Sequence, residues 1–478
     1  MTDTPGTAAT PSLPLRQWVL LAVVCTALLL EGMSLSSTNI QIPSIQRDLG
    51  LSESALPLVV SAFLVAFAGF LLLGGQCADV FGRRRVFITG LVLFAGASAL
   101  AGMAEGAAVL VTARALQGLG AALSLPAAVS IITNTFEEGR PRNQALAVYS
   151  ATGAAGFGVG LLVAGASTEL FDWRWGFWVY VPFALTAVVG AVLTVPAHRP
   201  ESRSTASWGS YLLISWTLIA VVAAAALAQE QAWMLSLLVV VAALVPAVWF
   251  ITIQRGSPTP PLPRDVVAAV PVLVATASLA LGFGTVTSAL FLAGVGLQEE
   301  LGYGALMAGV ALLPQGIMVL LLSSVGATLT ARIGPHRTLV TGLAFLGAGT
   351  LLLLTMNPAW SYWFTVLPAS TLIGIGVAFI FPASNIMAVN AVALERHGVT
   401  ASLIATGQQA GGAIGLAFVG AVLYGAQSFN ADAATTWALA ASAAYCVLGV
   451  LLVWYFQVKE RRNHGKKETS YDTRNRTR

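Results

Sequence analysis

Two ionisable residues, Glu31 and Arg114, stand inside long apolar stretches, whereas almost every other Asp, Glu, Lys and Arg falls between such stretches. An ionisable group within hydrocarbon costs about 2.5–3.5 kcal/mol even on a lenient insertion scale, so such residues are rare and usually functional. A buried carboxyl can take up and release a proton, and a guanidinium stays charged. The alternative is that Glu31 lies among lipid headgroups or is paired only for packing.

The elements that must position these two residues are membrane-spanning helices. Hydrophobic residues make up 57% of the 478 residues and charged residues 9%, which excludes a soluble globular domain. Because a spanning helix needs about 20 apolar residues, we predict six spans in residues 15–195, two in 208–254 and six in 266–456. The sequence therefore predicts an all-α integral membrane protein with fourteen spans, or twelve or thirteen if the middle pair is misread.

The basic residues set the orientation. With fourteen spans, all of the 24 Lys and Arg except Arg47, Arg114 and Arg174 fall on the side of the two termini. Cytoplasmic loops carry such an excess, so both termini are predicted to be cytoplasmic. Residues 1–14 form an N-terminal tail, and residues 457–478 form a basic tail expected to lie on anionic headgroups. The net charge of +4 thus reflects topology and does not indicate a nucleic-acid partner.

Between the second and third spans lies Gly-Gln-Cys-Ala-Asp-Val-Phe-Gly-Arg-Arg-Arg, residues 75–85. It resembles the loop signature of the major facilitator superfamily, G-x-x-x-D-x-x-G-R-[RK]-x, and matches at every key position: Gly75, Asp79, Gly82, Arg83 and Arg84. The resemblance implies a cytoplasmic gate at these residues. A basic loop that only sets topology is the alternative for the arginines.

Further segments follow in the order that this family has. Residues 110–122 resemble its span-four motif around Arg114, and Gly156, Gly160 and Gly165 resemble a degenerate copy of its glycine-rich antiporter motif. Residues 173–177 (Trp-Arg-Trp-Gly-Phe) and 398–413 resemble segments of fourteen-span drug:proton antiporters. The resemblance covers residues 15–456. It implies two six-helix bundles related by a pseudo-two-fold axis, with two extra central helices inserted between them.

One departure from the family pattern concerns the first span. Asn39 keeps its place in the motif L-D-x-T-x-x-N, but the Asp position is Ser34, and the acid lies three residues earlier at Glu31. Three residues are nearly one helical turn on the same face. We therefore expect Glu31 to titrate, with Ser34 as a hydrogen-bonding neighbour. At 1.5 Å per residue, Glu31 and Arg114 both fall in the outer half of the membrane, facing one cavity, and their direct contact stays open.

The resemblance implies proton-coupled efflux of lipophilic drugs or antibiotics across the bacterial cytoplasmic membrane by alternating access. A transporter of one endogenous metabolite or natural product is the alternative, and coupling to sodium instead of protons stays open. Membrane lipid and a small lipophilic substrate are the expected partners; we expect a monomer, no cofactor and no metal, and no known catalytic motif indicates an enzyme. Candidate residues of a substrate cavity are Asn39, Gln117, Tyr149, Phe157, Phe283, Phe291, Gln315, Asn385 and Gln408.

Overall fold

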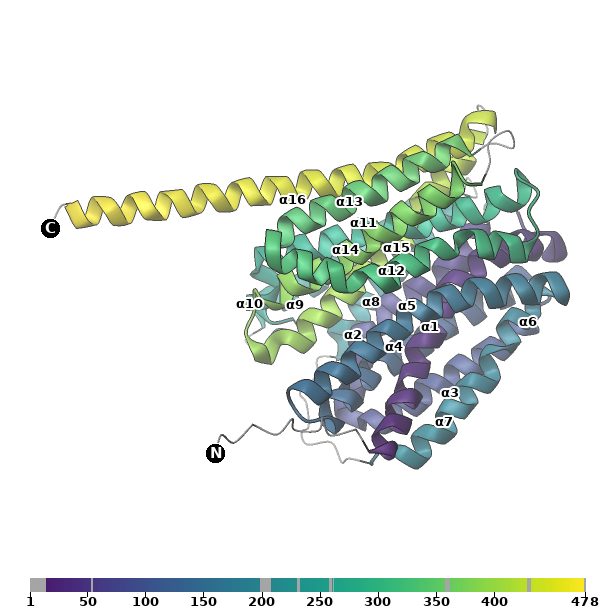
Figure 1. Ribbon diagram of the computed structural model, residues 1–478, viewed down its shortest axis with the longest axis horizontal. Helices are drawn as coiled ribbons and strands as arrows, with labels where there is room; N and C mark the ends of the chain where they lie inside the picture. Colours follow the sequence, from purple (N-terminus) through teal and green to yellow (C-terminus); the bar gives the residue numbers. More distant parts are fainter. Residues whose placement is uncertain are drawn as a thin grey trace, which may run out of the picture.

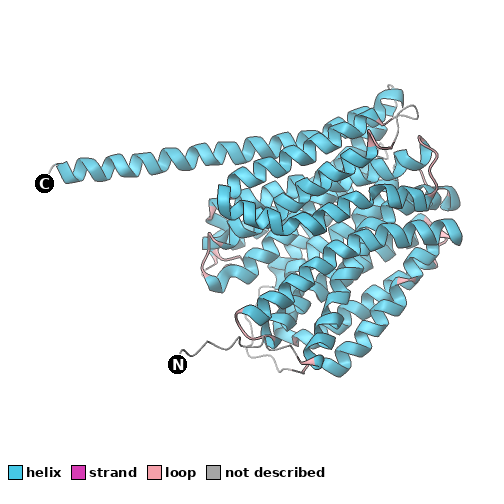
Figure 2. Cartoon of the chain, in the orientation of Figure 1, coloured by secondary structure: helices cyan, strands magenta, loops and turns pink. Residues whose placement is uncertain are grey.

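The computed structural model of the chain describes residues 14–52, 55–197, 208–229, 233–257, 260, 262–356, 362–427 and 431–476. The described part is helical and contains no strand (Figure 2). Helices are expected because hydrocarbon offers no partners to backbone N–H and C=O groups. In the described residues, 13 helices are long and apolar enough to cross a membrane. The helix at Trp208 supplies only a shorter apolar segment, so the count of fourteen spans stays a prediction.

The first seven helices form the N-terminal half, drawn purple to blue in Figure 1. Two of them, α6 and α7, follow one another within the sixth predicted span. The helices are α1 (Leu15–Leu49), α2 (Leu56–Phe81), α3 (Arg83–Gly102), α4 (Ala107–Thr135), α5 (Arg140–Leu170), α6 (Trp173–Trp178) and α7 (Tyr180–Thr194).

The inserted pair and the C-terminal half follow. The pair is α8 (Trp208–Gln229) and α9 (Trp233–Gly256). The C-terminal half, green to yellow in Figure 1, comprises α10 (Arg264–Ala268), α11 (Val270–Glu299), α12 (Ala305–Ile333), α13 (Pro335–Leu352), η2 (Leu353–Thr355), α14 (Val366–Val389), η3 (Leu394–Arg396), α15 (His397–Gln427) and α16 (Ala431–Arg476).

The two halves repeat one packing pattern. In the N-terminal half α1 packs on α5, and α2 and α3 pack on α4; in the C-terminal half α11 packs on α15, and α12 and α13 pack on α14. Glycines occupy matching contacts. Gly90 meets Gly120 between α3 and α4, and Gly342 meets Gly376 between α13 and α14. Small residues at helix crossings let the backbones approach closely. The packing agrees with the two repeated bundles that the resemblance implied.

The loops after α2 and α12 share a second feature of the repeat. Gly82 has φ of 94° and Gly334 has φ of 87°, a left-handed region that residues with a Cβ disfavour. Each glycine ends one helix and immediately precedes the next. The two loops therefore share one turn geometry, with Asp79 three residues before the glycine in the first copy and Ala331 in the second.

The most extensive contacts between the two halves pair α2 with α15, α5 with α12, and α1 with α11. The last two pairs carry hydrogen bonds near the outward ends of the helices. The Glu169 carboxylate accepts from the Leu306 backbone N–H at 2.8 Å, in the first turn of α12. The Gln298 side chain donates to the Ile40 carbonyl oxygen at 2.9 Å. These bonds hold the halves together on the side that the sequence predicts to be extracellular.

Two helices run beyond the predicted ends of their spans. The α1 helix continues through Pro43 to Leu49, and α16 continues to Arg476, past the predicted start of the tail at residue 457. Hydrophobicity marks where hydrocarbon ends, but helical backbone bonding continues wherever the sequence permits it. The N-terminal tail predicted at residues 1–14 lies outside the described residues except for Pro14.

Candidate functional site

Arg114 lies deep in the N-terminal half, with 1% of its surface exposed. Its Nη1 donates to the Ser34 Oγ at 2.6 Å and to the Gln117 Oε1 at 2.9 Å. Its Nε donates to the Val59 carbonyl oxygen at 3.3 Å, and its guanidinium lies 4.7 Å from the centre of the Phe63 ring. Helices α1, α2 and α4 thus surround one cation with neutral oxygens and an aromatic face. Such acceptors and rings stabilise a buried charge that has no carboxylate beside it.

Gln117 extends this network to a fourth helix, α3. Its Nε2 donates to the Ser98 Oγ at 2.8 Å, and Ser98 in turn donates to the Phe94 carbonyl oxygen at 2.6 Å. Gln117 is fully buried between Arg114 and α3. In this structure it orients Arg114, and its membership of a substrate cavity, expected from the sequence, stays a prediction.

Glu31 lies at the junction of the two halves. Its side chain is 8% exposed, and its Oε1 accepts a hydrogen bond from the Gln409 Nε2 of α15 at 3.1 Å. Tyr149 of α5 lies close enough to interact electrostatically with the Glu31 carboxyl. At the same level of the bundle, α1 and α5 pack closely at Gly32 and Gly156. One carboxyl therefore connects α1 of the first half with α15 of the second.

Glu31 and Arg114 do not form an ion pair in the described structure. The position at which the family carries Asp is Ser34, and it is Ser34 that binds the guanidinium. Glu31, one turn earlier, is directed to the C-terminal half instead. The direct contact left open above is therefore absent, and Ser34, expected as a hydrogen-bonding neighbour of Glu31, binds Arg114.

The sequence analysis named Gln408 as a candidate cavity residue, but the residue that hydrogen-bonds Glu31 is its neighbour Gln409. Helix periodicity could have indicated which of the two glutamines faces the N-terminal half. Gly407, Gly411 and Gly415 recur every four residues and pack against α11 of their own half. At about 100° per residue, Gln409 points away from this glycine face and Gln408 lies nearer to it. The side opposite a small-residue stripe is the one that reaches the other half.

The glycine that lets α2 approach α4 closely lies one residue before the loop signature. The close approach of α2 to α4 is made by Gly74, where an added Cβ would overlap the Ala122 carbonyl oxygen, whereas a Cβ on Gly75 would meet only Pro126 at 3.9 Å. Asp79 is exposed, and no ion pair joins it to Arg83 in the described structure. Arg84 donates to the Val192 carbonyl oxygen at 2.5 Å, which ties α3 to the end of α7.

The glycines of the antiporter motif are contact points of α5. A Cβ on Gly156 would lie 2.6 Å from the Leu29 carbonyl oxygen, and one on Gly160 would lie 2.5 Å from the Met33 carbonyl oxygen, both in α1. A Cβ on Gly165 would lie 2.7 Å from the Leu306 Cα in α12. These glycines allow α5 to pack tightly against both halves. Their role in gating stays a prediction.

We expect Gly160→Ala to destabilise the protein, because the added methyl group must push α1 away from α5. Separating these helices strains the 2.7 Å hydrogen bond from Ser36 Oγ to the Phe157 carbonyl oxygen. The cost of overpacking is about 1–3 kcal/mol. Thermal unfolding in detergent should show a lower midpoint for this variant. Gly96→Ala is the matched control, because nothing lies within 4 Å of a Cβ at Gly96; equal midpoints would contradict the packing role.

The other candidate cavity residues divide by burial. Asn39, Phe291, Gln315 and Tyr149 are buried, while the rest are partly exposed: Phe157, Phe283, Asn385 and Gln408. Asn39 is fully buried and its Oδ1 has no hydrogen-bond partner. The Asn385 Nδ2 donates to the Phe381 carbonyl oxygen of its own helix at 2.8 Å. Their membership of a substrate cavity stays a prediction.

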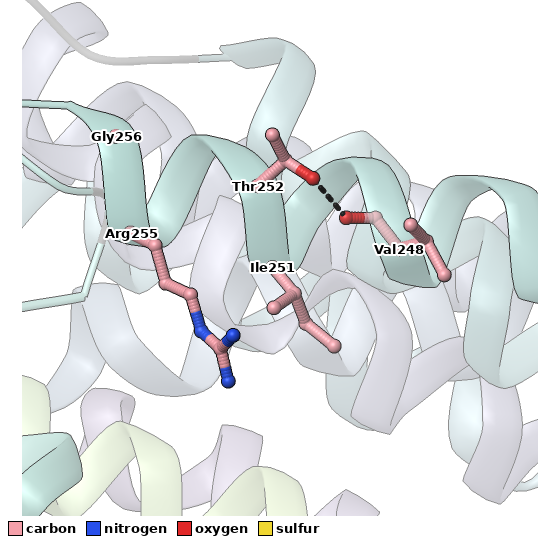
Figure 3. A pocket seen from close by; sticks show the side chains of 5 residues that line it. All are labelled: Val248, Ile251, Thr252, Arg255 and Gly256. Carbon is pink, nitrogen blue, oxygen red and sulfur yellow. Dashed lines mark hydrogen bonds between the residues drawn. The ribbon is translucent and has the colours of Figure 1, made fainter.

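A shallow surface pocket lies elsewhere, on α9. It is lined by Val248, Ile251, Thr252, Arg255 and Gly256, and Figure 3 shows the Thr252 hydroxyl bonded to the Val248 carbonyl oxygen, at 2.8 Å. None of the candidate residues lines it. Because α9 is largely exposed and apolar, this pocket is a groove on its outer face.

The Trp-Arg-Trp segment forms a polar clasp at the outward end of the N-terminal half. Arg174 pairs with Asp48 at 2.7 Å and donates to the Ala104 carbonyl oxygen at 3.0 Å. The Trp173 indole N–H donates to the same Asp48 carboxylate at 3.1 Å, and Gln41 donates to the Trp173 carbonyl oxygen at 2.7 Å. The segment thus ties α1, α6 and the loop before α4 together.

The described helices form two glycine-packed bundles with the buried Glu31 carboxyl between them. The family model of the Major Facilitator Superfamily matches residues 24–416 and, in a second match, 272–475. The chain belongs to this superfamily. It is a multi-span transporter of the bacterial cytoplasmic membrane.

Among its relatives, a puromycin resistance protein of Streptomyces alboniger is 37% identical over 431 residues, covering 88% of this chain and 85% of the relative. A cephamycin export protein of Amycolatopsis lactamdurans is 30% identical, covering 83% of each chain. A multidrug efflux pump of Mycolicibacterium smegmatis is 28% identical, covering 89% and 85%. A crystal structure of a peptide transporter with sulfate has the same fold, with a TM-score of 0.67, 15% identity and coverage of 92% and 98%.

Proposed function

We propose that this transporter exports a lipophilic drug or antibiotic in exchange for protons, with Glu31 as the residue that binds and releases the proton. The names of the relatives support export of such compounds. The observation that carries the proposal for Glu31 is its hydrogen bond with Gln409, because this bond joins the two halves at a buried carboxyl. A bond that differs in strength between the charged and neutral carboxyl links protonation to the relative position of the halves.

The energetics agree with a neutral or zwitterionic cargo. One proton supplies about 2.3 kcal/mol from a potential of 100 mV and about 1.4 kcal/mol from one pH unit, near 3.7 kcal/mol in total. That energy sustains a concentration gradient of about 500-fold for a neutral compound. A monovalent cation exchanged for one proton moves no net charge, so only the pH term of about 1.4 kcal/mol would drive it.

The proposal is tested with purified protein in proteoliposomes. We expect an imposed pH gradient to drive more puromycin into proteoliposomes that are acidic inside than into protein-free vesicles, which trap this basic amine passively. Nigericin, which collapses the gradient, should abolish the difference. Replacing sodium with choline should leave the rate unchanged if protons are the coupling ion. Puromycin transport that needs sodium and ignores the pH gradient would contradict proton coupling.

Gln409→Leu tests the link between the halves. Removing the amide leaves the Glu31 carboxylate without its hydrogen-bond donor, which favours the protonated carboxyl. We expect slower efflux and a pH dependence shifted to more alkaline values, measured as initial rates across a pH series. Gln408→Leu is the matched control for the pH profile, because Gln408 does not bond Glu31; only the profile is compared, since Gln408 is itself a candidate cavity residue. An unchanged pH profile in Gln409→Leu would show that the bond has no role in coupling.

Export of one natural product is a second candidate. Several relatives carry the name of a single compound, such as puromycin or cephamycin, whereas another is named as a multidrug pump. A resistance screen in a host without its own efflux pumps separates the two. Protection against one compound class favours a dedicated exporter, and protection against unrelated lipophilic compounds favours a multidrug exporter.

A further inference from the structure

The inserted helix α8 contacts both halves of the transporter, at one of the two equivalent interfaces between them. The α2–α15 and α5–α12 contacts are related by the internal repeat, but α8 packs on α2 and on α15. A helix that bridges two bodies that move must stay with one of them and slide against the other. The nature of its contacts indicates which.

The contacts of α8 with α2 are directional and close. The Tyr211 side chain hydrogen-bonds the Gln76 side chain, inside the loop signature and three residues before Asp79. The Ser215 Oγ donates to the Gly69 carbonyl oxygen at 2.5 Å, and a Cβ on Gly69 would lie 3.4 Å from the Ser215 Cα. The rings of Trp208 and Phe81 lie 5.8 Å apart.

The contacts of α8 toward α15 belong to an apolar cluster. Buried Leu72, Tyr211 and Leu262 form its centre, and Ile214 of α8 packs against it together with Val399 and Leu403 of α15. Apolar side chains contact one another without fixed direction, so such a surface can slide at little cost. Hydrogen bonds within hydrocarbon have no water to replace them, so they hold a position.

The segment after α9 is fastened to the opposite half. Gln254 at the end of α9 holds Leu262 through both its amide N–H and its carbonyl oxygen, at 2.5 and 3.1 Å. Asp265 in α10 then pairs with Arg396, just before α15, at 3.2 Å. The inserted pair therefore begins on the N-terminal half and ends on the C-terminal half.

We propose that α8 moves as part of the N-terminal half, and that the apolar interface between α8 and α15 slides when the cytoplasmic gate opens and closes. Tyr211 is then a positioning residue that holds Gln76 in the loop signature. The inserted pair acts as a strap that spans the two halves and limits how far they separate. This inference rests on the proposed transport cycle.

Two cysteine pairs test the proposal in a background in which Cys25, Cys77 and Cys446 are replaced by serine. Phe81→Cys with Trp208→Cys joins α2 to α8, and Ile214→Cys with Leu403→Cys joins α8 to α15. Both pairs are crosslinked with a short bis-methanethiosulfonate, and puromycin efflux is measured before crosslinking, after it, and after reduction. We expect the α8–α15 crosslink to stop efflux reversibly and the α2–α8 crosslink to leave most of it.

Retained efflux with the α8–α15 crosslink, or lost efflux with the α2–α8 crosslink, would overturn the proposal. A second measurement does not need the cargo. Spin labels at the same pairs should give a distance distribution that changes between acidic and alkaline pH across α8–α15 and stays fixed across α2–α8. If the parent protein moves no puromycin, the proposed function fails, while these distances still show whether the α8–α15 interface slides.

Discussion

Glu31→Gln is expected to abolish uphill drug movement. Glutamine has the same shape as a protonated glutamate and can still hydrogen-bond Gln409, but it cannot release a proton. The pH gradient then has no way to perform work, so the accumulation above that of protein-free vesicles, at most about tenfold per pH unit, should be lost. The measurement is puromycin accumulation in proteoliposomes under an imposed pH gradient, with the melting temperature recorded in detergent.

The control for this variant is Glu105→Gln, which removes an exposed carboxylate before α4. We expect normal accumulation there. The melting temperature of Glu31→Gln should not fall, because a neutral amide replaces a buried ionisable group. If Glu31→Gln still concentrates the drug in response to the pH gradient, another residue carries the proton and the assignment is wrong.

Arg114→Ala is expected to have the second-largest effect, a loss of at least about tenfold in efflux rate together with lower stability. The substitution leaves Ser34 and Gln117 without the donor that both of them accept from. Each buried polar group left unsatisfied costs about 1–3 kcal/mol. It also removes the cation bound to Ser34, a residue one helical turn from Glu31 in α1.

Arg114→Lys separates charge from geometry. Lysine keeps the positive charge but is a single point donor, and it cannot reproduce the planar fork that binds Ser34, Gln117 and Val59 at once. We expect Arg114→Lys to recover part of the stability and little of the transport rate. Arg174→Lys, in the outward clasp, should keep most of the rate. Full transport in Arg114→Ala would assign Arg114 to packing alone.

The sequence by itself determined the class of fold and the two unusual charges. Long apolar stretches can only become helices in hydrocarbon, because backbone groups have no other partners there. The cost of an intramembrane charge singled out Glu31 and Arg114 without any structure. The signature around Asp79 and the glycine pattern of the fifth span identified the family, and the family model agrees.

Only the tertiary structure decided which side chains meet. The sequence placed Glu31 and Arg114 at similar depths, but depth does not give helix rotation, and the structure pairs Arg114 with Ser34 and Glu31 with Gln409. Gln408 and Gln409 are the same type of residue, but their side chains point in directions about 100° apart around the helix. Likewise, Gly74 and not Gly75 makes the close approach to α4. Hydrophobicity measures how much of a helix is apolar, whereas contact depends on the direction in which each residue points, and packing between helices alone fixes that direction.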